Sequence, residues 1–466
     1  MMKKYKDYFI TIGLEIHVAL NTKEKLFSAT SNGFSGEDFQ FLDAGVPGVL
    51  PVLSSEPVEM AVAFGLAVQS DIKKVSLFER KHYFYPDLPL GYQITQQHAP
   101  ILIGGIVKIK DEDGKDVTVF IEHAHLECDA AKSIHDLYPQ YSAIDLSRCA
   151  SPLLEIVSTP CLHSPEEAKE YAKRVHALSM FMGICDGKIE EGSFRVDASI
   201  SLCKVEGKLG TRVEIKNISS FSFLEAALHS EMRRQADLLD AGKVLDMETR
   251  QFDEKSMETK PMRMKETVDE YRYMPCPDIP ALVIDDEFID DIKARYDISY
   301  FDYQEKLKEL FSKFSIKFDE RLFSVYWTDK TKEVWKYVLK NPALQTERVV
   351  RILAFWLPEI LTKTIEIEDF KTLEKSELQA KELKDVVSSW ISSEKSIAEC
   401  LPQMMSYDDL KTIVQNILIQ FPEQTTKYKK GEIKMIQFLI GKVMAQVKGK
   451  APAQDVKNCV ETYLSQ

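Results

Sequence analysis

The stretch Gly187–Phe221, GKIEEGSFRVDASISLCKVEGKLGTRVEIKNISSF, sets the architecture of the first half of this chain. Apolar and polar residues alternate with period 2 on both sides of Glu206–Gly207, which predicts two β-strands joined by a short turn. If the strands pair as a hairpin, one face is aliphatic and the other carries Arg195, Asp197, Glu214 and Lys216. A solvated sheet face also carries mixed charge, so this pattern alone leaves a structural and a functional interpretation open.

Length and composition bound the possible answers. With 466 residues, of which 44% are hydrophobic and 29% charged, the chain is expected to fold into two to four domains. Its eight cysteines include no CxxC pair, which favours a reducing compartment over a disulfide framework or zinc site, and hence a cytoplasmic location. We expect neither a signal peptide nor a membrane span. The formal net charge of −13 argues against broad non-specific nucleic-acid binding but leaves room for a local basic patch.

Two further strand patterns carry groups that bind metals. In residues 8–20, Glu15 and His17 lie two positions apart and therefore point the same way on a strand, which suits a divalent cation. Taken alone, Glu-x-His is a weak signal. In residues 117–131, one parity begins with Val117, Val119 and Ile121 and ends with four potential ligands: His123, His125, Glu127 and Asp129.

A carboxylate interrupts the next apolar strand. Glu155 lies within PLLEIVSTP, and a buried carboxylate needs a partner, for which the nearest candidate in sequence is Arg148. Upstream, residues 78–97 combine Arg80 and Lys81 with several aromatic residues and a Pro-Asp-Leu-Pro turn. Two interpretations remain open there: an aromatic plug in the core, or a loop that offers cations to phosphate and a ring to a base or ribose.

The remainder of the chain divides into a charged stretch and a helical one. Residues 248–280 interleave basic residues, including Arg263 and Lys265, with acids; a helix surface would explain this, but Pro261 argues against one long helix. Such a mixture suits a phosphate-plus-metal site. Residues 286–410 are helical in pattern. The last forty residues hold eight Lys against three acidic residues, which is typical of a solvated helix face but also of an RNA-backbone contact.

An ordered series of motifs adds a family resemblance. GLEIHVAL, PGVLPVL, RKHYFYPDLPLGYQITQ, HLECDAAK, PLLEIVSTP, EEGSFRVDASISL, GTRVEIKNISSF and EYRYMPCPDIP follow one another through residues 8–280. Together they resemble the B subunit of the glutamyl/aspartyl-tRNA amidotransferase, and GEIKMIQFLIGKVMAQVKGKAP resembles the tail domain of that family. The resemblance implies an α+β chain: a mostly antiparallel-sheet cradle catalytic domain at 1–290, a helical domain at 291–410 and a small helical tRNA-binding tail at 411–466.

The resemblance also implies an activity. Family members use ATP and Mg²⁺ to phosphorylate the side-chain carboxylate of Glu-tRNA(Gln) or Asp-tRNA(Asn), and ammonia then displaces the phosphate. The ammonia comes from the amidase (A) subunit, and a small C subunit completes a heterotrimer. This chain lacks the amidase signature, so a partner has to supply ammonia. It also lacks a Walker A sequence and a kinase-type Gly-rich loop, so a carboxylate-held metal site is the most economical way to hold a triphosphate.

The expected site residues follow from both lines of reasoning. As direct or water-mediated metal ligands we expect Glu15, His17, Glu127, Asp129, Asp197 and Glu214. As contacts to phosphate, nucleotide or the acceptor end we expect Arg80, Lys81, Arg148, Arg195, Lys216, Arg263 and Lys265. The chain departs from the family pattern at Cys128, where the family usually has Glu, and a neutral thiol is a poor Mg²⁺ ligand.

That departure motivates a hypothesis of another class. A tRNA-binding scaffold whose kinase site has decayed would retain tRNA binding and form no amidated product. A third hypothesis, a metal- and ATP-dependent carboxylate ligase acting on a free small molecule, predicts turnover without tRNA and leaves the basic tail unexplained.

Overall fold

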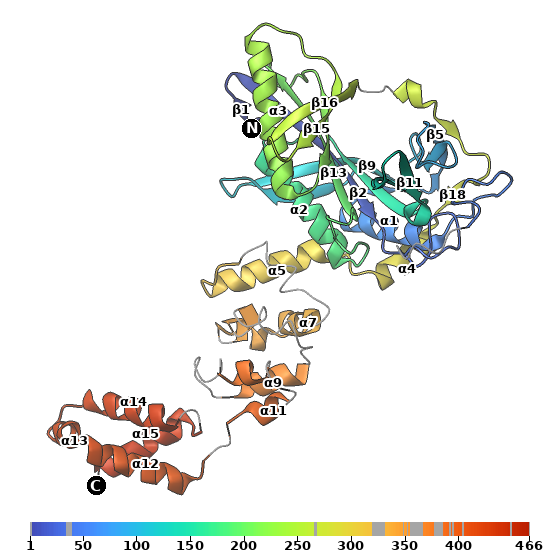
Figure 1. Ribbon diagram of the computed structural model, residues 1–466. Coiled ribbons are helices and arrows are strands. Elements are labelled where there is room, and N and C mark those ends of the chain that lie inside the picture. The colour runs from blue at the N-terminus through green and yellow to red at the C-terminus, as the bar shows by residue number, and fades with distance from the viewer. Residues whose placement is uncertain are drawn as a thin grey trace. The chain divides into compact units, whose positions relative to one another are not determined.

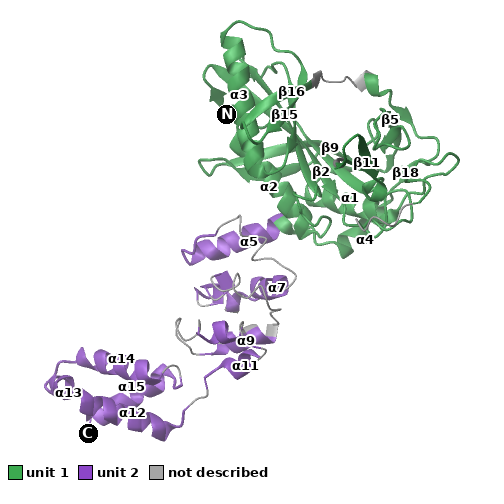
Figure 2. Cartoon of the chain, in the orientation of Figure 1, with its two compact units in different colours: residues 1–300 green, residues 301–466 purple. Residues whose placement is uncertain are grey.

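A computed structural model describes residues 2–465 except 34–39, 265–267, 319–330, 348, 352, 355–366, 377–384, 391–392, 394–395, 403–404 and 448–449. The chain forms two compact units, Met1–Tyr300 and Phe301–Gln466 (Figure 2). The first unit holds the strands and the second is built from helices (Figure 1). The predicted α+β class is confirmed, whereas the three-domain division stays a prediction.

An eleven-stranded sheet forms the centre of the first unit. Its path runs β16-β15-β14-β13-β2-β12-β9-β7-β3, with β1 paired to β2 and β8 paired to β9. Among the pairings of the described strands in this sheet, β14–β15 is parallel and the others are antiparallel. The strands are β1 (Lys4–Tyr5), β2 (Tyr8–Ala19), β3 (Asp71–Ile72), β7 (Leu102–Ile103), β8 (Ile106–Lys110), β9 (Asp116–Cys128), β12 (Pro152–Ser158), β13 (Phe194–Cys203), β14 (Val213–Ile218), β15 (Glu248–Asp253) and β16 (Glu258–Met264).

The predicted hairpin exists as β13 and β14. Ala198 pairs with Ile215 and Ile200 with Val213, which places the aliphatic residues on one face. The connection spans residues 204–212 and is therefore longer than the short turn predicted from Glu206–Gly207. Residues 248–264 form a second hairpin rather than a helix surface, in agreement with the argument from Pro261, which pairs with Arg250.

One face of the sheet is covered by helices because its residues are apolar. Ile12, Leu14, Ile16 and Val18 of β2 are at most 2% exposed, and α2 (Pro165–Phe181) and α3 (Phe221–Asp240) pack on this side (Figure 1). Both helices begin at a serine cap: the Ser164 hydroxyl accepts a hydrogen bond from the backbone N–H of Glu167, and Ser220 accepts one from Phe223. The opposite face of the same strands carries the polar residues.

The first unit also contains three smaller sheets and several short helices. They form a three-stranded sheet, β17-β5-β6, and two two-stranded ones, β10-β11 and β18-β4. The elements are α1 (Ser55–Ala67), β4 (Val75–Ser76), β5 (Glu79–His82), β6 (Tyr92–Thr95), β10 (Lys132–Tyr138), β11 (Tyr141–Asp145), η1 (Leu146–Arg148), η2 (Val268–Tyr271), β17 (Met274–Pro275), β18 (Leu282–Val283) and α4 (Asp286–Arg295).

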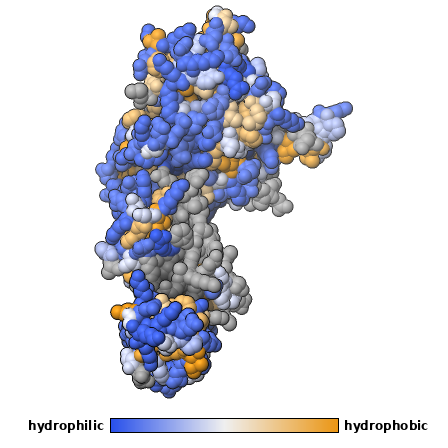
Figure 3. Space-filling model, turned by 90° about the vertical axis from the view of Figure 1, so that its left-hand side faces the viewer, coloured by the Kyte–Doolittle hydropathy of each residue, from blue (hydrophilic) through white to orange (hydrophobic). Residues whose placement is uncertain are grey.

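The second unit contains α5 (Tyr300–Lys313, which begins at the boundary residue), α7 (Lys332–Lys340), η4 (Pro342–Leu344), α9 (Ile367–Lys375), α11 (Ile397–Cys400), α12 (Tyr407–Gln420), α13 (Pro422–Lys429), α14 (Met435–Val447) and α15 (Ala453–Ser465). Buried residues of α12, α14 and α15 share one hydrophobic cluster. The helices that the structure describes include none with the length and apolarity needed to cross a membrane. In the view of Figure 3 most surface residues are hydrophilic, and hydrophobic ones form small separate groups.

Candidate active site

Strand register gathers the polar residues on the face of the sheet that points away from α2 and α3. His17 of β2 pairs with Arg195 of β13 on one side and with Glu155 of β12 on the other, and Glu155 pairs in turn with His125 of β9. One row further along, Glu15 pairs with Asp197. Because directly paired residues point to the same side of a sheet, segments that lie far apart in the sequence present their charged groups together.

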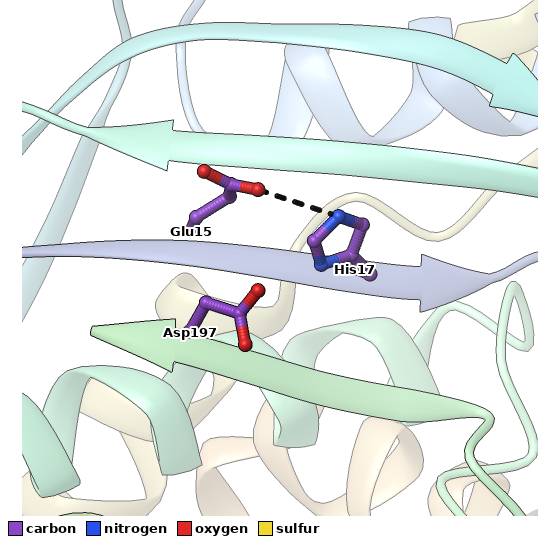
Figure 4. A group of neighbouring side chains, drawn as sticks. All are labelled: Glu15, His17 and Asp197. Carbon is purple, nitrogen blue, oxygen red and sulfur yellow. Dashed lines mark ion pairs between the residues drawn. The ribbon is translucent and has the colours of Figure 1, made fainter. Parts of the chain in front are cut away.

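His17 is the centre of this cluster. Its Nε2 lies 3.3 Å from Glu155 Oε2, 3.5 Å from Glu15 Oε1 and 3.8 Å from Glu127 Oε1. Figure 4 shows Glu15 and His17 on β2, with Asp197 on the neighbouring strand β13. Ligand atoms of Glu15, His17 and Asp197 lie within 4.8 Å of one another, and so do those of His17, Glu127 and Glu155.

The charges of these groups compensate one another. Burial lowers the pKa of His17, but the hydrogen bond to Glu155 and the charges of Glu155 and Glu15 outweigh it and raise that pKa to about 9. The negative charge of Glu155, followed by burial, raises the pKa of Glu15 to about 7. Burial opposes ionisation of Glu155, yet His125 and His17 hold its pKa well below the usual range. Glu155 is thus the anion that keeps His17 charged.

The predicted partner of Glu155 was wrong. Arg148 does not serve Glu155; its Nε lies 3.1 Å from Asp129 Oδ2, and a nitrogen of Arg195 lies 3.1 Å from Asp129 Oδ1. Glu155 pairs instead with His17 and with His125, whose Nε2 lies 3.7 Å away. Arg148 was chosen because it is close to Glu155 in the sequence. In the sheet, however, Glu155 of β12 lies beside residues of the paired strands β2 and β9. Glu155 is therefore a member of the site that was not in the predicted ligand set.

Lys216 joins the remaining acids to the cluster. Its Nζ lies 2.7 Å from Asp197 Oδ2 and 3.3 Å from Glu214 Oε1, and Thr249 donates a hydrogen bond to Glu214 Oε2. Burial lowers the pKa of Lys216, but the charges of Asp197, Glu214 and Glu15 outweigh burial and raise it. Of the six expected metal ligands, Glu15, His17, Glu127 and Asp197 belong to the two groups of adjacent ligand atoms at this face. The other two, Asp129 and Glu214, form ion pairs with basic side chains and are in neither group.

A cavity of about 950 Å³ opens beside this cluster. Two of the cluster residues, His17 and Asp197, line it. Four cationic side chains also line it: Lys132, Arg148, Arg195 and Lys216. Lys132 was missed by the sequence analysis, although it lies in the HLECDAAK motif directly after the potential metal ligands. The arrangement offers a triphosphate both cations and a place for a divalent ion.

The other predicted cations lie elsewhere or outside the description. Arg80 pairs with Asp278 and stacks over the Tyr92 ring at 4.4 Å. Burial lowers the pKa of Lys81, but nearby charges, chiefly that of Glu127, outweigh burial and raise it; the Lys81 ammonium lies 4.9 Å from the centroid of the Tyr271 ring. The backbone of Arg263 pairs with Thr249 in β16, and its side chain is not described. Lys265 lies outside the described residues.

A β-bulge in β9 corrects the predicted shared face of residues 117–129. His123 pairs with Val157, but Ile121 pairs with Ser158, so one extra residue lies in β9 at this point. The bulge reverses the alternation: Ile121 and Val119 lie on the buried apolar side, whereas His123 and His125 stand on the polar face. The same parity in the sequence therefore corresponds to two faces in the structure.

Cys128 lies away from the two groups of ligand atoms. In the sequence it stands between Glu127 and Asp129. Its side chain lines a separate small cavity together with Phe27 and Ile94. Cys149 lines the same cavity. Burial raises the pKa of the Cys128 thiol well above its ordinary value, so the group stays neutral.

Comparisons with known proteins identify the family of this chain. Residues 10–290, which contain the sheet and its polar face, match the family model of the GatB/GatE catalytic domain, and residues 358–464 match that of the GatB domain. The first match identifies an amidotransferase catalytic domain. Relatives named as the B subunit of aspartyl/glutamyl-tRNA(Asn/Gln) amidotransferase occur in Legionella pneumophila strain Lens, at 40% identity over 98% of this chain and all of the relative, and in Nitrosococcus oceani, at 37% identity over 97% and 99%.

The chain therefore belongs to the family of aspartyl/glutamyl-tRNA amidotransferase B subunits. A further relative of the same name, from Francisella tularensis subsp. novicida, is 36% identical over 98% of the chain and all of the relative. The resemblance inferred from the motifs is confirmed, and so is the expected class of enzyme, a ligase of the amidotransferase type.

Proposed function

We propose that this chain uses ATP and Mg²⁺ to phosphorylate the side-chain carboxylate of Glu-tRNA(Gln), Asp-tRNA(Asn) or both, and that it amidates the activated carboxylate with ammonia. The products are Gln-tRNA(Gln) and Asn-tRNA(Asn). The observation that carries the proposal is the convergence of Glu15, His17 and Asp197 beside a cavity lined by four cations. Phosphorylation of a carboxylate brings one anion onto another, so the site has to neutralise several negative charges at once.

The residues present fit a divalent ion. Glu15 and Asp197 would supply carboxylate oxygens, the donors that Mg²⁺ prefers, and His17 would contribute directly or through a bound water. Glu155 keeps His17 charged and orients its ring, and Glu127 lies 3.8 Å from the same ring nitrogen. When bound there, Mg²⁺ would neutralise part of the phosphate charge.

The cations have separate tasks. Arg148 and Arg195 are both held by Asp129, which aims two guanidinium groups into the cavity, where they bind phosphate oxygens. Lys216 forms ion pairs with Asp197 and Glu214, and Lys132 adds a further positive charge at the wall. Lys81, opposite Glu127 and Glu155, contacts the incoming acceptor end or nucleotide. We keep Arg80, Arg263 and Lys265 as weaker candidates for nucleotide or acceptor-end contacts.

The partners follow from the reaction. Ammonia has to be supplied, and we assign this task to the amidase (A) subunit, with a small C subunit completing a heterotrimer in the cytoplasm. We propose residues 1–290 as the catalytic domain, 291–410 as the helical domain and 411–466 as the tRNA-binding tail. The position of Cys128, outside the groups of adjacent ligand atoms, supports catalysis over a decayed scaffold, since the thiol replaces none of the carboxylates next to His17.

The test is a transamidation assay with the heterotrimer reconstituted around this chain. Glu15→Ala and Asp197→Ala each remove one oxygen ligand and are expected to lower formation of phosphorylated Glu-tRNA by at least about a hundredfold, the scale seen when a residue that stabilises developing charge is lost. The matched control is Glu206→Ala, which removes a carboxylate from the exposed β13–β14 connection. Thermal unfolding of each variant establishes that folding is intact.

Three outcomes would contradict the proposal. Near-normal rates in both variants would show that the site is wrong. Intact tRNA binding without product in the unmodified complex would favour the scaffold. Turnover of free glutamate in the absence of tRNA would favour the small-molecule ligase.

A further inference from the structure

A second group of metal-binding side chains lies on the helix-covered side of the sheet. Among the described residues, three sets bring three such side chains together, and two of these sets share His17 on the polar face. The third consists of Glu166 of α2 and of Glu225 and His229 of α3, which we call the helix cluster. One ligand atom of each residue lies within 4.8 Å of those of the other two. The proposed function uses none of the three.

The spacing on α3 brings two of these ligands together. Glu225 and His229 are four residues apart, and side chains at this spacing lie on the same face of a helix, where they can hold one metal ion. α2 packs against α3 and places Glu166, in its first turn, beside them. Glu166 Oε1 lies 3.1 Å from His229 Nε2, so the two helices contribute to one group.

The donor set combines an imidazole nitrogen with two carboxylates. Acids near the start of a helix are stabilised by the helix dipole, so the two glutamates alone would not indicate a ligand. The histidine between them changes the chemistry, because one imidazole and two carboxylates match zinc sites that have three protein ligands and a water molecule. Mg²⁺ and Ca²⁺ take oxygen ligands, so the imidazole favours zinc over both.

The surroundings of Glu166 hold its carboxylate ready as a ligand. Burial opposes the ionisation of Glu166, but hydrogen bonds from its own backbone N–H and from Ser164, together with the charge of His229, outweigh burial and lower its pKa. Ser164 lies outside the helix cluster and orients this carboxylate, as groups behind metal ligands do. The side chains of His229 and Glu166 are 43% and 32% exposed, so an ion can enter from solvent and keep a bound water.

One cation competes for the helix cluster. The Lys169 ammonium pairs with Oε2 of Glu225, which leaves the other carboxylate oxygen for an ion. The positive charge of Lys169 would repel a divalent ion bound next to it. Removal of Lys169 should therefore strengthen ion binding, although it removes an ion pair from the folded chain.

We propose that Glu166, Glu225 and His229 bind a zinc ion that joins α2 to α3. The ion replaces the proton between His229 and Glu166, because an imidazole that binds a metal has to be neutral. Water completes its coordination. Both helices pack on the apolar side of the large sheet, so the ion stabilises the support of the catalytic strands from the side away from the polar face. The site is separate from the proposed function and does not depend on it.

Calorimetric titration of the full chain with Zn²⁺ at neutral pH tests the site. His17→Gln serves as the background, because His17 belongs to both sets of ligands on the polar face. In this background one equivalent of Zn²⁺ should bind. His229→Ala or Glu166→Gln should then weaken binding at least about a hundredfold, more than the loss of a group that only orients a ligand. Co²⁺ in place of Zn²⁺ should show visible absorption that the same variants lose.

Thermal unfolding supplies a second readout. Zn²⁺ at about ten times its dissociation constant should raise the melting temperature of the His17→Gln chain by about 2 °C, since an ion that binds only the folded state stabilises it. His229→Ala in the same background should show no such rise. Its melting temperature without Zn²⁺ establishes that the variant is folded.

Two further variants separate a metal site from a plain ion pair. Lys169→Gln should tighten Zn²⁺ binding about tenfold, because it removes a like charge near the ion. A cluster with only a structural role would gain no affinity from this change. His98→Asn is the matched control: His98 pairs with the single carboxylate of Glu79, and its loss should leave Zn²⁺ binding unchanged.

Failure of the zinc site and failure of the proposed function are distinguishable. Absence of Zn²⁺ binding in the His17→Gln background, or binding that His229→Ala leaves intact, would overturn the site and leave the proposed function standing. Zinc binding that follows the pattern above, in a complex that forms no amidated tRNA, would support the site and overturn the function.

Discussion

At the scale of single residues, charge compensation defines the site. Six acids and several cations share one sheet face, and each acid lies near a cation or a histidine. Glu155 shows the principle: its carboxylate is almost fully buried, which is costly in isolation, but His17 and His125 both contact it. The two histidines thus offset the cost of burying this carboxylate.

The buried cysteines Cys128 and Cys149 are expected to react slowly with alkylating reagents. Burial raises the pKa of Cys128 well above its ordinary value and that of Cys149 to about 12, so at pH 8 both are thiols rather than thiolates. Because only the thiolate reacts, iodoacetamide at pH 8 should label the partly exposed Cys161 and Cys203 at least about tenfold faster in the folded chain. Mass spectrometry of the peptides over time measures these rates.

Unfolding in urea provides the control, since all four cysteines should then react at similar rates. Labelling of Cys128 in the folded chain as fast as that of Cys203 would contradict the burial-based assignment.

At the scale of elements, two capped helices support the central strands. The Ser164 hydroxyl accepts a 3.2 Å hydrogen bond from the N–H of Glu167 at the start of α2. Pro165 follows at the first helical position, where no backbone donor is needed. Cap and proline together fix where α2 begins, and α2 covers the apolar side of β2 and β8.

Ser164→Ala should lower the free energy of unfolding by about 1 kcal/mol, the usual value of an N-cap. In a unit of this size the corresponding fall in the melting temperature is about 2 °C. Transamidation at 25 °C should not change, because α2 lies on the opposite side of the sheet from the site. Differential scanning calorimetry measures the effect. Ser256→Ala, in the exposed turn between β15 and β16, is the matched control; an equal loss there would refute the role of the cap.

At the scale of the whole molecule, the chain combines two units that have separate cores. The last helices of the second unit share a cluster of buried residues from Leu410 to Leu464, drawn from α12, α14 and α15 and the turn before α15. A segment with its own core is expected to fold by itself, and the basic residues of this segment make it the expected contact with tRNA.

A fragment of residues 401–466 should therefore unfold cooperatively on heating, with a helical circular dichroism spectrum. Leu439→Ala, at a fully buried position of α14, should cost about 2–5 kcal/mol and abolish the transition in so small a fragment. Ile419→Ala in α12 is the matched control because Ile419 is 75% exposed. A fragment that melts without a transition, or equal effects of both substitutions, would contradict the independent core.

Local sequence pattern predicts the central strands and many of the residues on their polar face. Period-2 alternation predicts β2, β9, β13 and β14 and, outside the bulge in β9, which side of each strand is polar, because the backbone alone fixes that alternation. Which residues pair with one another depends on contacts between distant segments. The bulge itself, the pairing of Glu155 with two histidines, and the entry of Lys132 into the cavity all depend on register between distant strands. Register is set by packing of the whole apolar face against α2 and α3, a property that no local pattern contains.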